Sequence, residues 1–163
     1  MTRMKIKFFT TGGTIDKVYF DKKSDYQVGK PKIVSILKEM NINFDYDYES
    51  LMRKDSIDMT DDDRRLIYNK VLADAHDRII ITHGTDTMAE TGTVLKSITG
   101  KVIVLTGAIE PAEFKTSDAA FNIGAAIAAV QILHPGVYIA MNGRIYDPDR
   151  VQKNRNRNRF EEL

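Results

Sequence analysis

The sequence predicts a single α/β domain: a doubly wound, mostly parallel sheet with helices on both faces. Compact apolar runs typical of buried strands alternate at least four times with segments of helical periodicity. The run Lys101–Leu105 is near-continuously apolar, as expected of a strand that is covered on both faces. The chain has 163 residues, and a domain of this size buries roughly 70% of its unfolded surface.

The first third of the chain supplies two strands and one helix. Met4–Phe9 is predicted to be a strand, and residues 10–30 a polar loop with several glycines. Apolar side chains at helical spacing predict a helix over Lys32–Met40, and aromatic alternation predicts a strand over Phe44–Leu51. A polar turn at Asp55–Asp58 ends that strand.

The second helix has the clearest start. Thr60 is a suitable N-cap, and Asp61–Asp63 suit the positive end of the helix dipole. This helix is predicted to run to about Ala75.

The rest of the chain continues the alternation up to a polar tail. Residues 153–159 alternate basic residues with asparagine and are predicted to be loop or frayed helix. The remaining predicted elements, in order, are a strand at Asp77–Thr82, a helix at Met88–Ser97, a strand at Lys101–Leu105, a helix at Asp118–Leu133 and a strand at Gly136–Met141.

Composition excludes several classes of function. The net charge of +1 does not favour nucleic acid or an anionic membrane as a partner. The absence of cysteine excludes disulfides, a thiol nucleophile and cysteine-ligated zinc. The longest apolar stretch, Ile123–Leu133, is too short to span a bilayer. A cytoplasmic location is the default expectation.

Two motifs present threonine hydroxyls where predicted strands end. Thr10–Ile15 turns through Gly12 and Gly13 to Thr14, and Ile81–Thr87 turns through Gly84 to Thr85. Ligands bind past the carboxyl ends of strands in open α/β sheets, so both turns point to one pocket and to a hydroxyl nucleophile.

Each motif also has a purely structural interpretation. The first is equally consistent with a glycine-rich turn between a strand and a helix, and it lacks the spacing of known phosphate-binding loops. In the second, Thr85 or Asp86 suits the N-cap of the following helix. His83 is expected to pack and hydrogen-bond locally rather than to act as a base.

Lys153 and Tyr26 are functional candidates only in combination with these two motifs. A lysine held near a carboxylate can deprotonate a hydroxyl, which is a possible role for Lys153, although spacing alone favours a solvated tail lysine. Tyr26 lies in the predicted loop, where a tyrosine either closes over a site or packs against the surface. The three arginines at 155, 157 and 159 are expected in a solvated tail or a subunit contact.

Taken together, the motifs resemble those of the bacterial-type L-asparaginases, in the same order along almost the whole chain. Thr11–Ile15 matches the first family signature and His83–Met88 the second. Further matching segments are Ser24–Tyr26 with Val28–Lys30, Asp55–Met59, Thr106–Ala108, and Ala140–Gly143 through Asp147 to Val151–Lys153.

The resemblance implies roles by position. Thr14 would be the primary nucleophile with Tyr26 assisting, and Thr85, Asp86 and Lys153 would form a second catalytic set. Ser56 and Asp86 would bind the carboxylate and amino ends of the substrate. The Ala108 carbonyl would lie near the leaving nitrogen, and Ile57 and Gly84 would line the substrate site.

The chain also departs from the family pattern. Most members carry a C-terminal domain that supplies an acidic residue to a neighbouring subunit's site. Residues 1–163 are expected to be a single N-terminal-type domain with no C-terminal domain, ending naturally at Phe160–Leu163. Position 57 is Ile, where the family often has a glutamine that contacts the substrate. Of the family's residues that bind the substrate ammonium group, Asp86 is therefore the one that remains.

The resulting hypothesis is an L-asparaginase that uses no metal or organic cofactor and forms a homo-oligomer, a dimer or tetramer. One alternative is an amidohydrolase or amidotransferase component acting on a different amide. The other is a catalytically silent module that binds aspartate or asparagine.

Overall fold

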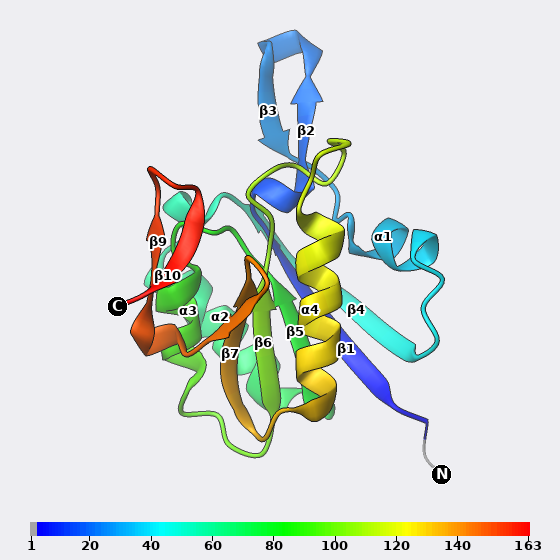
Figure 1. Cartoon of the computed structure of the whole chain (residues 1–163), viewed down its shortest axis with the longest axis vertical. Helices are drawn as coiled ribbons and strands as arrows, with labels where there is room; N and C mark the ends of the chain where they lie inside the picture. Colours follow the sequence, from blue (N-terminus) through cyan, green and yellow to red (C-terminus); the bar gives the residue numbers. More distant parts are fainter. Residues whose placement is uncertain (1–2) are drawn as a thin grey trace.

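A six-stranded sheet forms the middle of the computed structural model, which describes residues 3–163 (Figure 1). Its spatial order is β4-β1-β5-β6-β7-β8. The first five strands are parallel, and β8 runs antiparallel to β7. The strands are β1 (Lys5–Gly12), β4 (Asp45–Lys54), β5 (Arg78–Thr82), β6 (Val102–Thr106), β7 (Gly136–Met141) and β8 (Arg144–Tyr146).

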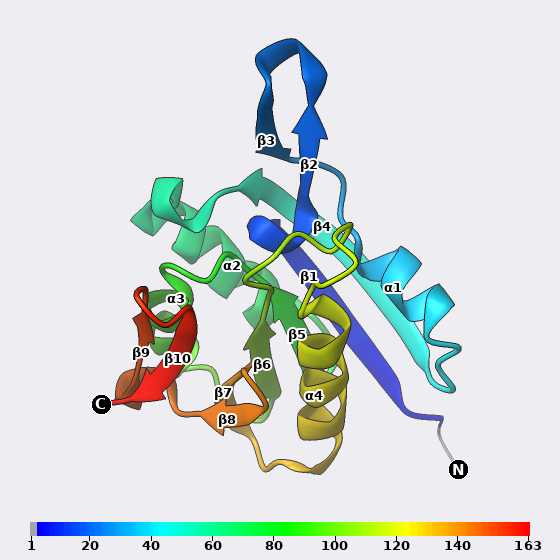
Figure 2. The same ribbon diagram turned by 45° about the horizontal axis from the view of Figure 1, so that its top comes forward.

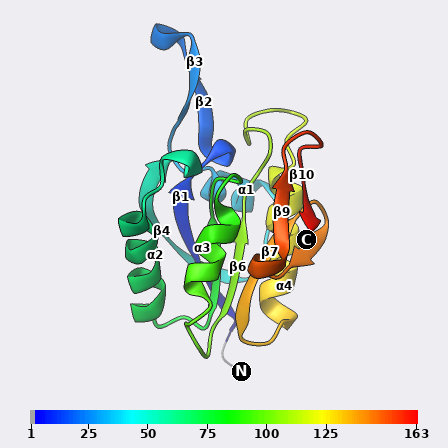
Figure 3. The same ribbon diagram turned by 90° about the vertical axis from the view of Figure 1, so that its left-hand side faces the viewer.

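Helices cover both faces of this sheet, so the predicted fold class is confirmed. Helices α2 (Asp61–Ala73) and α3 (Met88–Leu95) lie on one face, and α1 (Ile33–Glu39) and α4 (Ala119–Ile132) on the other (Figure 3). Successive side chains of β5 point to opposite faces of the sheet and so contribute to both cores. Ile79 and Ile81 join the core beneath α2 and α3, while Ile80 joins the core beneath α1 and α4.

The central strands end at one level, which matters for the site. In the parallel register Thr10 of β1 pairs with Thr82 of β5, and Thr82 pairs with Thr106 of β6. The β-branched residues of β5 and β6 are buried on both faces and fix this register, because a slip of one residue would exchange their faces. The loops after β1, β5 and β6 therefore leave from the same edge of the sheet.

The prediction of an irregular loop over residues 10–30 is wrong for its middle part. Strands β2 (Lys17–Phe20) and β3 (Asp25–Val28) form an antiparallel hairpin that projects from the domain (Figures 1 and 3). Its tip turns through a short 3-10 helix, Asp21–Lys23, and Ser24 at φ 50°. Because the hairpin is largely exposed, it has no buried apolar face and leaves no periodic signal in the sequence.

The polar tail is also ordered differently from the prediction. Strands β9 (Val151–Asn154) and β10 (Arg159–Glu162) form a second antiparallel hairpin beside α3 (Figure 2). Only Val151 and Phe160 of the two strands are buried, and both join the core beneath α3. Each strand has a single buried apolar residue, and one such residue gives no alternating pattern from which a strand could be predicted.

Three further 3-10 helices connect the elements: η1 (Thr14–Asp16), η3 (Ser56–Asp58) and η4 (Pro148–Arg150). The predicted helices and the other predicted strands are confirmed to within a few residues at their ends. Among residues 3–163, every helix is too short or too polar to cross a membrane.

Helix α2 begins as predicted, with Thr60 as its N-cap. The Thr60 side chain accepts a hydrogen bond from the Asp63 amide, and the Asp63 carboxylate accepts one from the Thr60 amide. We expect Thr60→Ala to lower the free energy of unfolding by about 1 kcal/mol, because loss of the cap leaves the Asp63 amide without its partner. Urea denaturation measures this, with Thr99→Ala, at an exposed position outside the helices, as control. Equal stabilities of the two variants would contradict this role of Thr60.

Candidate active site

Close contacts at two glycines, Gly13 and Gly84, hold three loops together at the carboxyl edge of the sheet. Gly13 has φ 89°, and a Cβ added to it would lie 2.5 Å from Gly84 Cα. A Cβ on Gly84 would in turn lie 2.6 Å from Ser56 Oγ. Only glycine permits this approach at both positions. The contacts bring together the residues that follow, Thr14 on one loop and Thr85 on the other.

Lys153 connects the second of these loops to the C-terminal hairpin. Its Nζ donates to Thr85 Oγ1 at 2.7 Å and to Asp86 Oδ1 at 3.0 Å. The Lys153 and Asp86 side chains are largely buried, and Thr85 is 4% exposed. A lysine that the sequence leaves in a polar tail is thus fixed on two residues 67 and 68 positions away. The arrangement can pass a proton between an amine and a hydroxyl.

Ser56 organises the start of α3 from a different loop. Its Oγ accepts hydrogen bonds from the amides of Asp86 at 3.2 Å and Thr87 at 3.3 Å, and Thr87 Oγ1 donates to the Ser56 carbonyl. The predicted N-cap at Thr85 or Asp86 is wrong, because the helix begins at Met88 with Thr87 as its N-cap. Ser56 is fully buried, and because its oxygen accepts from both amides, its hydroxyl proton remains available to donate.

The other predicted substrate-lining residues differ in exposure. Ile57, beside Ser56 in η3, is 64% exposed, whereas Ala108 is fully buried. Ala108 follows Gly107, whose backbone packs closely on the His83 carbonyl. The loop after β6 therefore lies against the loop that carries Thr85.

His83 is a local packing residue, as predicted. It is fully buried, with Nδ1 2.7 Å from the Gly84 carbonyl and Nε2 2.8 Å from Thr91 Oγ1. Because a carbonyl only accepts, Nδ1 carries the proton and Nε2 accepts from the Thr91 hydroxyl. Burial lowers the pKa of His83 to about 4, which keeps the ring neutral at pH 7. The neutral ring fixes the Gly84 carbonyl.

Tyr26 lies on the projecting hairpin rather than in direct contact with the other candidate residues. Its ring packs edge-on against Tyr19 and Phe114, each with centroids 5.5 Å away. Within the described residues its hydroxyl forms no hydrogen bond. The Tyr26–Phe114 contact joins the hairpin to the loop between β6 and α4, which rises beside the hairpin base (Figure 1).

A depression opens between the hairpin and the end of β4. The Lys17–Asp55 ion pair, at 2.8 Å, crosses it and joins the hairpin base to the Ser56 turn. Burial raises the pKa of Asp55, but hydrogen bonds from Lys17 and the Ile57 amide outweigh this and lower it overall. The depression is lined by Lys17, Tyr26, Gln27, Val28, Arg53, Lys54, Asp55 and Asp58.

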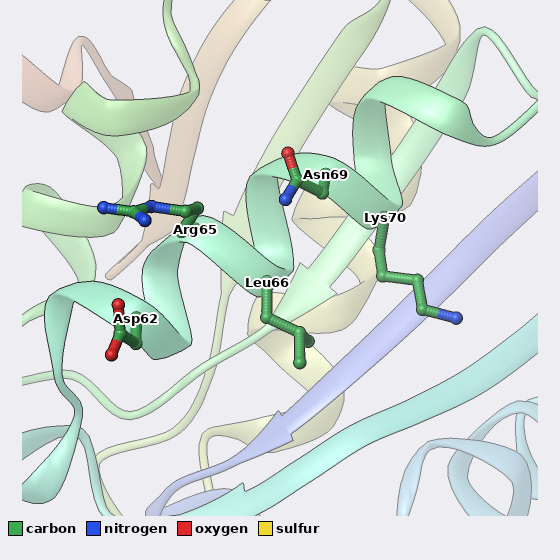
Figure 4. Close-up of a pocket in the computed structure, with 5 residues that line it drawn as sticks. All are labelled: Asp62, Arg65, Leu66, Asn69 and Lys70. Atoms are coloured by element: carbon green, nitrogen blue, oxygen red, sulfur yellow. The ribbon is translucent and has the colours of Figure 1, made fainter.

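Another depression lies on the exposed face of α2, away from these residues. It is lined by Asp62, Arg65, Leu66, Asn69 and Lys70, whose side chains project from successive turns of the helix (Figure 4). It shares no residue with the candidate site. Residues 3–163 also contain no group of three or more His, Asp or Glu side chains arranged to hold a metal ion.

Asp16 is a buried carboxyl group that the sequence analysis did not single out. It ends η1, two residues after Thr14, and is 2% exposed. Oδ1 accepts from the Lys32 amide at 2.9 Å, and its carbonyl accepts from the Gly29 amide. Oδ2 is buried without a hydrogen-bond partner among the described residues. An aspartate in a polar segment gives no sign of burial, so only the fold identifies it.

Burial raises the pKa of Asp16 to about 6, although the Lys32 amide and the charges of Lys32 and Arg53 act in the opposite direction. The folded protein therefore binds this proton more tightly than the unfolded chain, whose aspartate has a pKa of 3.8. The resulting contribution to the free energy of unfolding is complete below pH 3.8 and is lost as the pH rises through 6.

We compare the free energy of unfolding of Asp16→Asn with that of the wild type at two pH values. The difference should favour the variant by about 1–3 kcal/mol more at pH 8 than at pH 4.5, because asparagine stays neutral whereas Asp16 loses its proton. Chemical denaturation at both pH values measures this. Asp21→Asn, on the exposed hairpin tip, is the control and should show no such pH-dependent difference. A difference for Asp16→Asn that does not change with pH would contradict the buried, protonated group.

Comparisons with known proteins agree with this architecture. The model of the asparaginase N-terminal domain matches residues 5–161. L-asparaginase 2 of Escherichia coli is 30% identical over 162 residues, which cover 91% of this chain and 46% of the relative.

Solved structures give the same result. L-asparaginase I of Vibrio cholerae superposes with a TM-score of 0.84 at 27% identity, over 99% of this chain and 52% of that one. A probable cytoplasmic L-asparaginase of Campylobacter jejuni superposes with a TM-score of 0.79 at 29% identity. The match covers 97% of this chain and 51% of that one. The chain thus spans about half the length of the relatives it matches. It belongs to the asparaginase family and matches that family's N-terminal domain.

Proposed function

We propose that this protein is an L-asparaginase, which hydrolyses L-asparagine to L-aspartate and ammonia. The observation that carries the proposal is the hydrogen bonding of Lys153 Nζ to Thr85 and Asp86, beside the glycine contact that joins this loop to the Thr14 loop. Membership of the asparaginase family supports the same activity. The chain spans about half the length of these relatives.

In the proposed reaction Thr14 is the nucleophile. Its Oγ forms a bond to the side-chain amide carbon, the carbon–nitrogen bond breaks, and the hydroxyl proton leaves with the nitrogen as ammonia. Water then cleaves the ester, which releases aspartate and restores the hydroxyl group. Amide hydrolysis of this kind needs an activated hydroxyl and a proton path to the leaving nitrogen, and no metal or organic cofactor takes part.

The second set of residues serves proton transfer and substrate binding. Thr85 and Lys153 form a hydroxyl–amine pair at 2.7 Å, which provides the path for a proton. Asp86 binds the substrate ammonium group, and the Ala108 carbonyl accepts from the leaving amide nitrogen. Gly84 and Ile57 line the substrate. Ser56 binds the substrate carboxylate with its hydroxyl proton, while its oxygen holds the Asp86 loop in place through the two amide contacts described above.

Tyr26 assists Thr14 in this proposal after the hairpin moves. Its hydroxyl is free of hydrogen bonds within the described residues, and its ring is held by Tyr19 and Phe114 rather than by the domain core. A hairpin with an exposed surface and few core contacts is suited to closing over a substrate.

The proposal extends to assembly and location. Phe121 and Ile132 of α4 are 64% and 78% exposed, which supports a homo-oligomer, dimer or tetramer, that covers this face. Sedimentation velocity measures the assembly. The similarity to a protein described as probably cytoplasmic supports a cytoplasmic location.

The activity is tested by ammonia release from L-asparagine and from L-glutamine. We expect Thr14→Ala to reduce the rate with L-asparagine by at least about a thousandfold, because the nucleophile is lost. We expect Lys153→Met to reduce it by about a hundredfold or more, because the proton path is lost. Lys38→Met, at an exposed position on α1, is the matched control and should retain the wild-type rate.

Circular dichroism shows whether each variant is folded. Near-wild-type turnover in folded Thr14→Ala would overturn the role of Thr14. Release of ammonia from neither amide by folded wild-type protein would overturn the asparaginase proposal itself.

A further inference from the structure

Two side chains at the start of α4 hold the loop that follows β6. The Asp118 carboxylate accepts hydrogen bonds from the amide of Ile109 at 3.0 Å and from that of Glu110 at 3.1 Å. The Asn122 side chain donates to the Gly107 carbonyl at 2.9 Å and to Asp118 Oδ2 at 2.8 Å. The backbone at three positions of this loop is therefore fixed by two side chains that are themselves hydrogen-bonded to each other.

Neither of these side chains stabilises its own helix. Asp118 stands at the N-cap of α4, a position that suits a carboxylate, yet its side chain makes no capping hydrogen bond. Asn122 is fully buried, and its Oδ1 has no hydrogen-bond partner among the described residues. A buried polar atom without a partner costs free energy. The polar contacts that offset this cost are those to Asp118 and to the loop.

The contact with Asp118 determines the direction of the Ala108 carbonyl. In a trans peptide unit the carbonyl and the amide hydrogen point in opposite directions, and the described residues contain no cis peptide bond. The Ile109 amide belongs to the same unit as the Ala108 carbonyl, and it donates to Asp118. The carbonyl therefore points away from Asp118. Within residues 3–163 it accepts no hydrogen bond from the backbone.

The loop is also fixed on its other side. Gly107 packs so closely on the His83 carbonyl that a Cβ at this position would overlap it, and Ala108 is fully buried. An acceptor that is held before the substrate binds needs no reorganisation during the reaction. In addition, a peptide unit that donates its N–H to a carboxylate has a more strongly accepting carbonyl. Asp118 thus both orients the Ala108 carbonyl and strengthens it as an acceptor.

We propose that Asp118 and Asn122 are positioning residues, which hold the Ala108 carbonyl ready to accept a hydrogen bond from the leaving nitrogen of the substrate. This inference rests on the proposed function and deepens it, because it names the residues that select the substrate by its leaving group. A carbonyl only accepts, so it binds a leaving group that carries an N–H and gives nothing to an ester oxygen. The two residues therefore favour amides over esters of the same acid.

An amide and an ester with the same acyl group test this role. L-asparagine and the β-methyl ester of L-aspartate differ only in the leaving group, and methanol leaves from the ester in place of ammonia. We expect Asp118→Ala to lower kcat/KM for L-asparagine by about tenfold or more, because a hydrogen bond to the leaving group is weakened. The value for the ester should change by less than about twofold, because the ester never makes this bond. Release of ammonia and of methanol measures the two reactions.

Asp74→Ala is the matched control. Asp74 also accepts a hydrogen bond from a backbone amide, that of His76 at 2.9 Å, but it lies before β5 at the opposite edge of the sheet. This variant should keep the wild-type ratio of amide to ester hydrolysis. Asp118→Asn retains an acceptor for the Ile109 amide and should lose less of the amide activity than Asp118→Ala.

Two results would overturn the inference. One is an equal loss for amide and ester in Asp118→Ala, because a disturbed fold slows both reactions alike. The other is an unchanged rate with L-asparagine in this variant, once circular dichroism shows that it is folded. If Asp118→Ala does not fold, Asp118→Asn and Asn122→Ala decide by the same ratio.

The unmodified protein separates this inference from the proposed function. Ammonia release from L-asparagine, with equal losses for amide and ester in the variants, would reject the positioning role and leave the asparaginase proposal standing. No ammonia release from L-asparagine by the unmodified protein would reject the asparaginase proposal and this inference together.

Discussion

The candidate site depends on a steric constraint, the contact of the Gly13 backbone with that of Gly84. A side chain at either position would overlap backbone or the Ser56 side chain. Without this approach, the loops after β1 and β5 would separate by the thickness of a side chain. Thr14 and Thr85 would then belong to two loops at one sheet edge instead of to one site. The level ends of β1, β5 and β6 make the contact possible, and the glycines complete it.

Around this contact the structure supports each loop with buried polar groups. His83, kept neutral by burial, holds the Gly84 carbonyl, and Ser56 holds the amides of Asp86 and Thr87. Asp16 holds the segment after Thr14 against the Lys32 and Gly29 amides. None of these three groups needs to touch a substrate to matter. Each fixes the backbone from which a proposed functional side chain projects, which is how a loop site reaches the precision that catalysis requires.

Much of the fold was predictable because its strands and helices bury continuous apolar faces. The strands β5 and β6 and the helix α2 with its Thr60 cap follow directly from local pattern. The β2–β3 and β9–β10 hairpins were not predicted, since the first is mostly exposed and the second is anchored by Val151 and Phe160 alone. Both hairpins nevertheless carry proposed functional residues, Tyr26 and Lys153. The segments that periodicity describes least well are thus the ones that approach the site.

The sequence by itself determined the two glycine–threonine turns, the strands that precede them and the family to which the chain belongs. These properties are local, because a turn that requires glycine and a strand that requires β-branched residues are each specified by neighbours in the chain. Only the tertiary structure decided that Lys153 reaches Asp86, that Ser56 is buried, and that Asp16 lies in the interior. Those properties depend on contacts between residues far apart in the chain, such as Lys153 with Asp86, which are 67 positions apart, and Asp86 with Ser56, which are 30 apart. Such distances are set by how the sheet edge and the two hairpins pack together, and no local pattern records them.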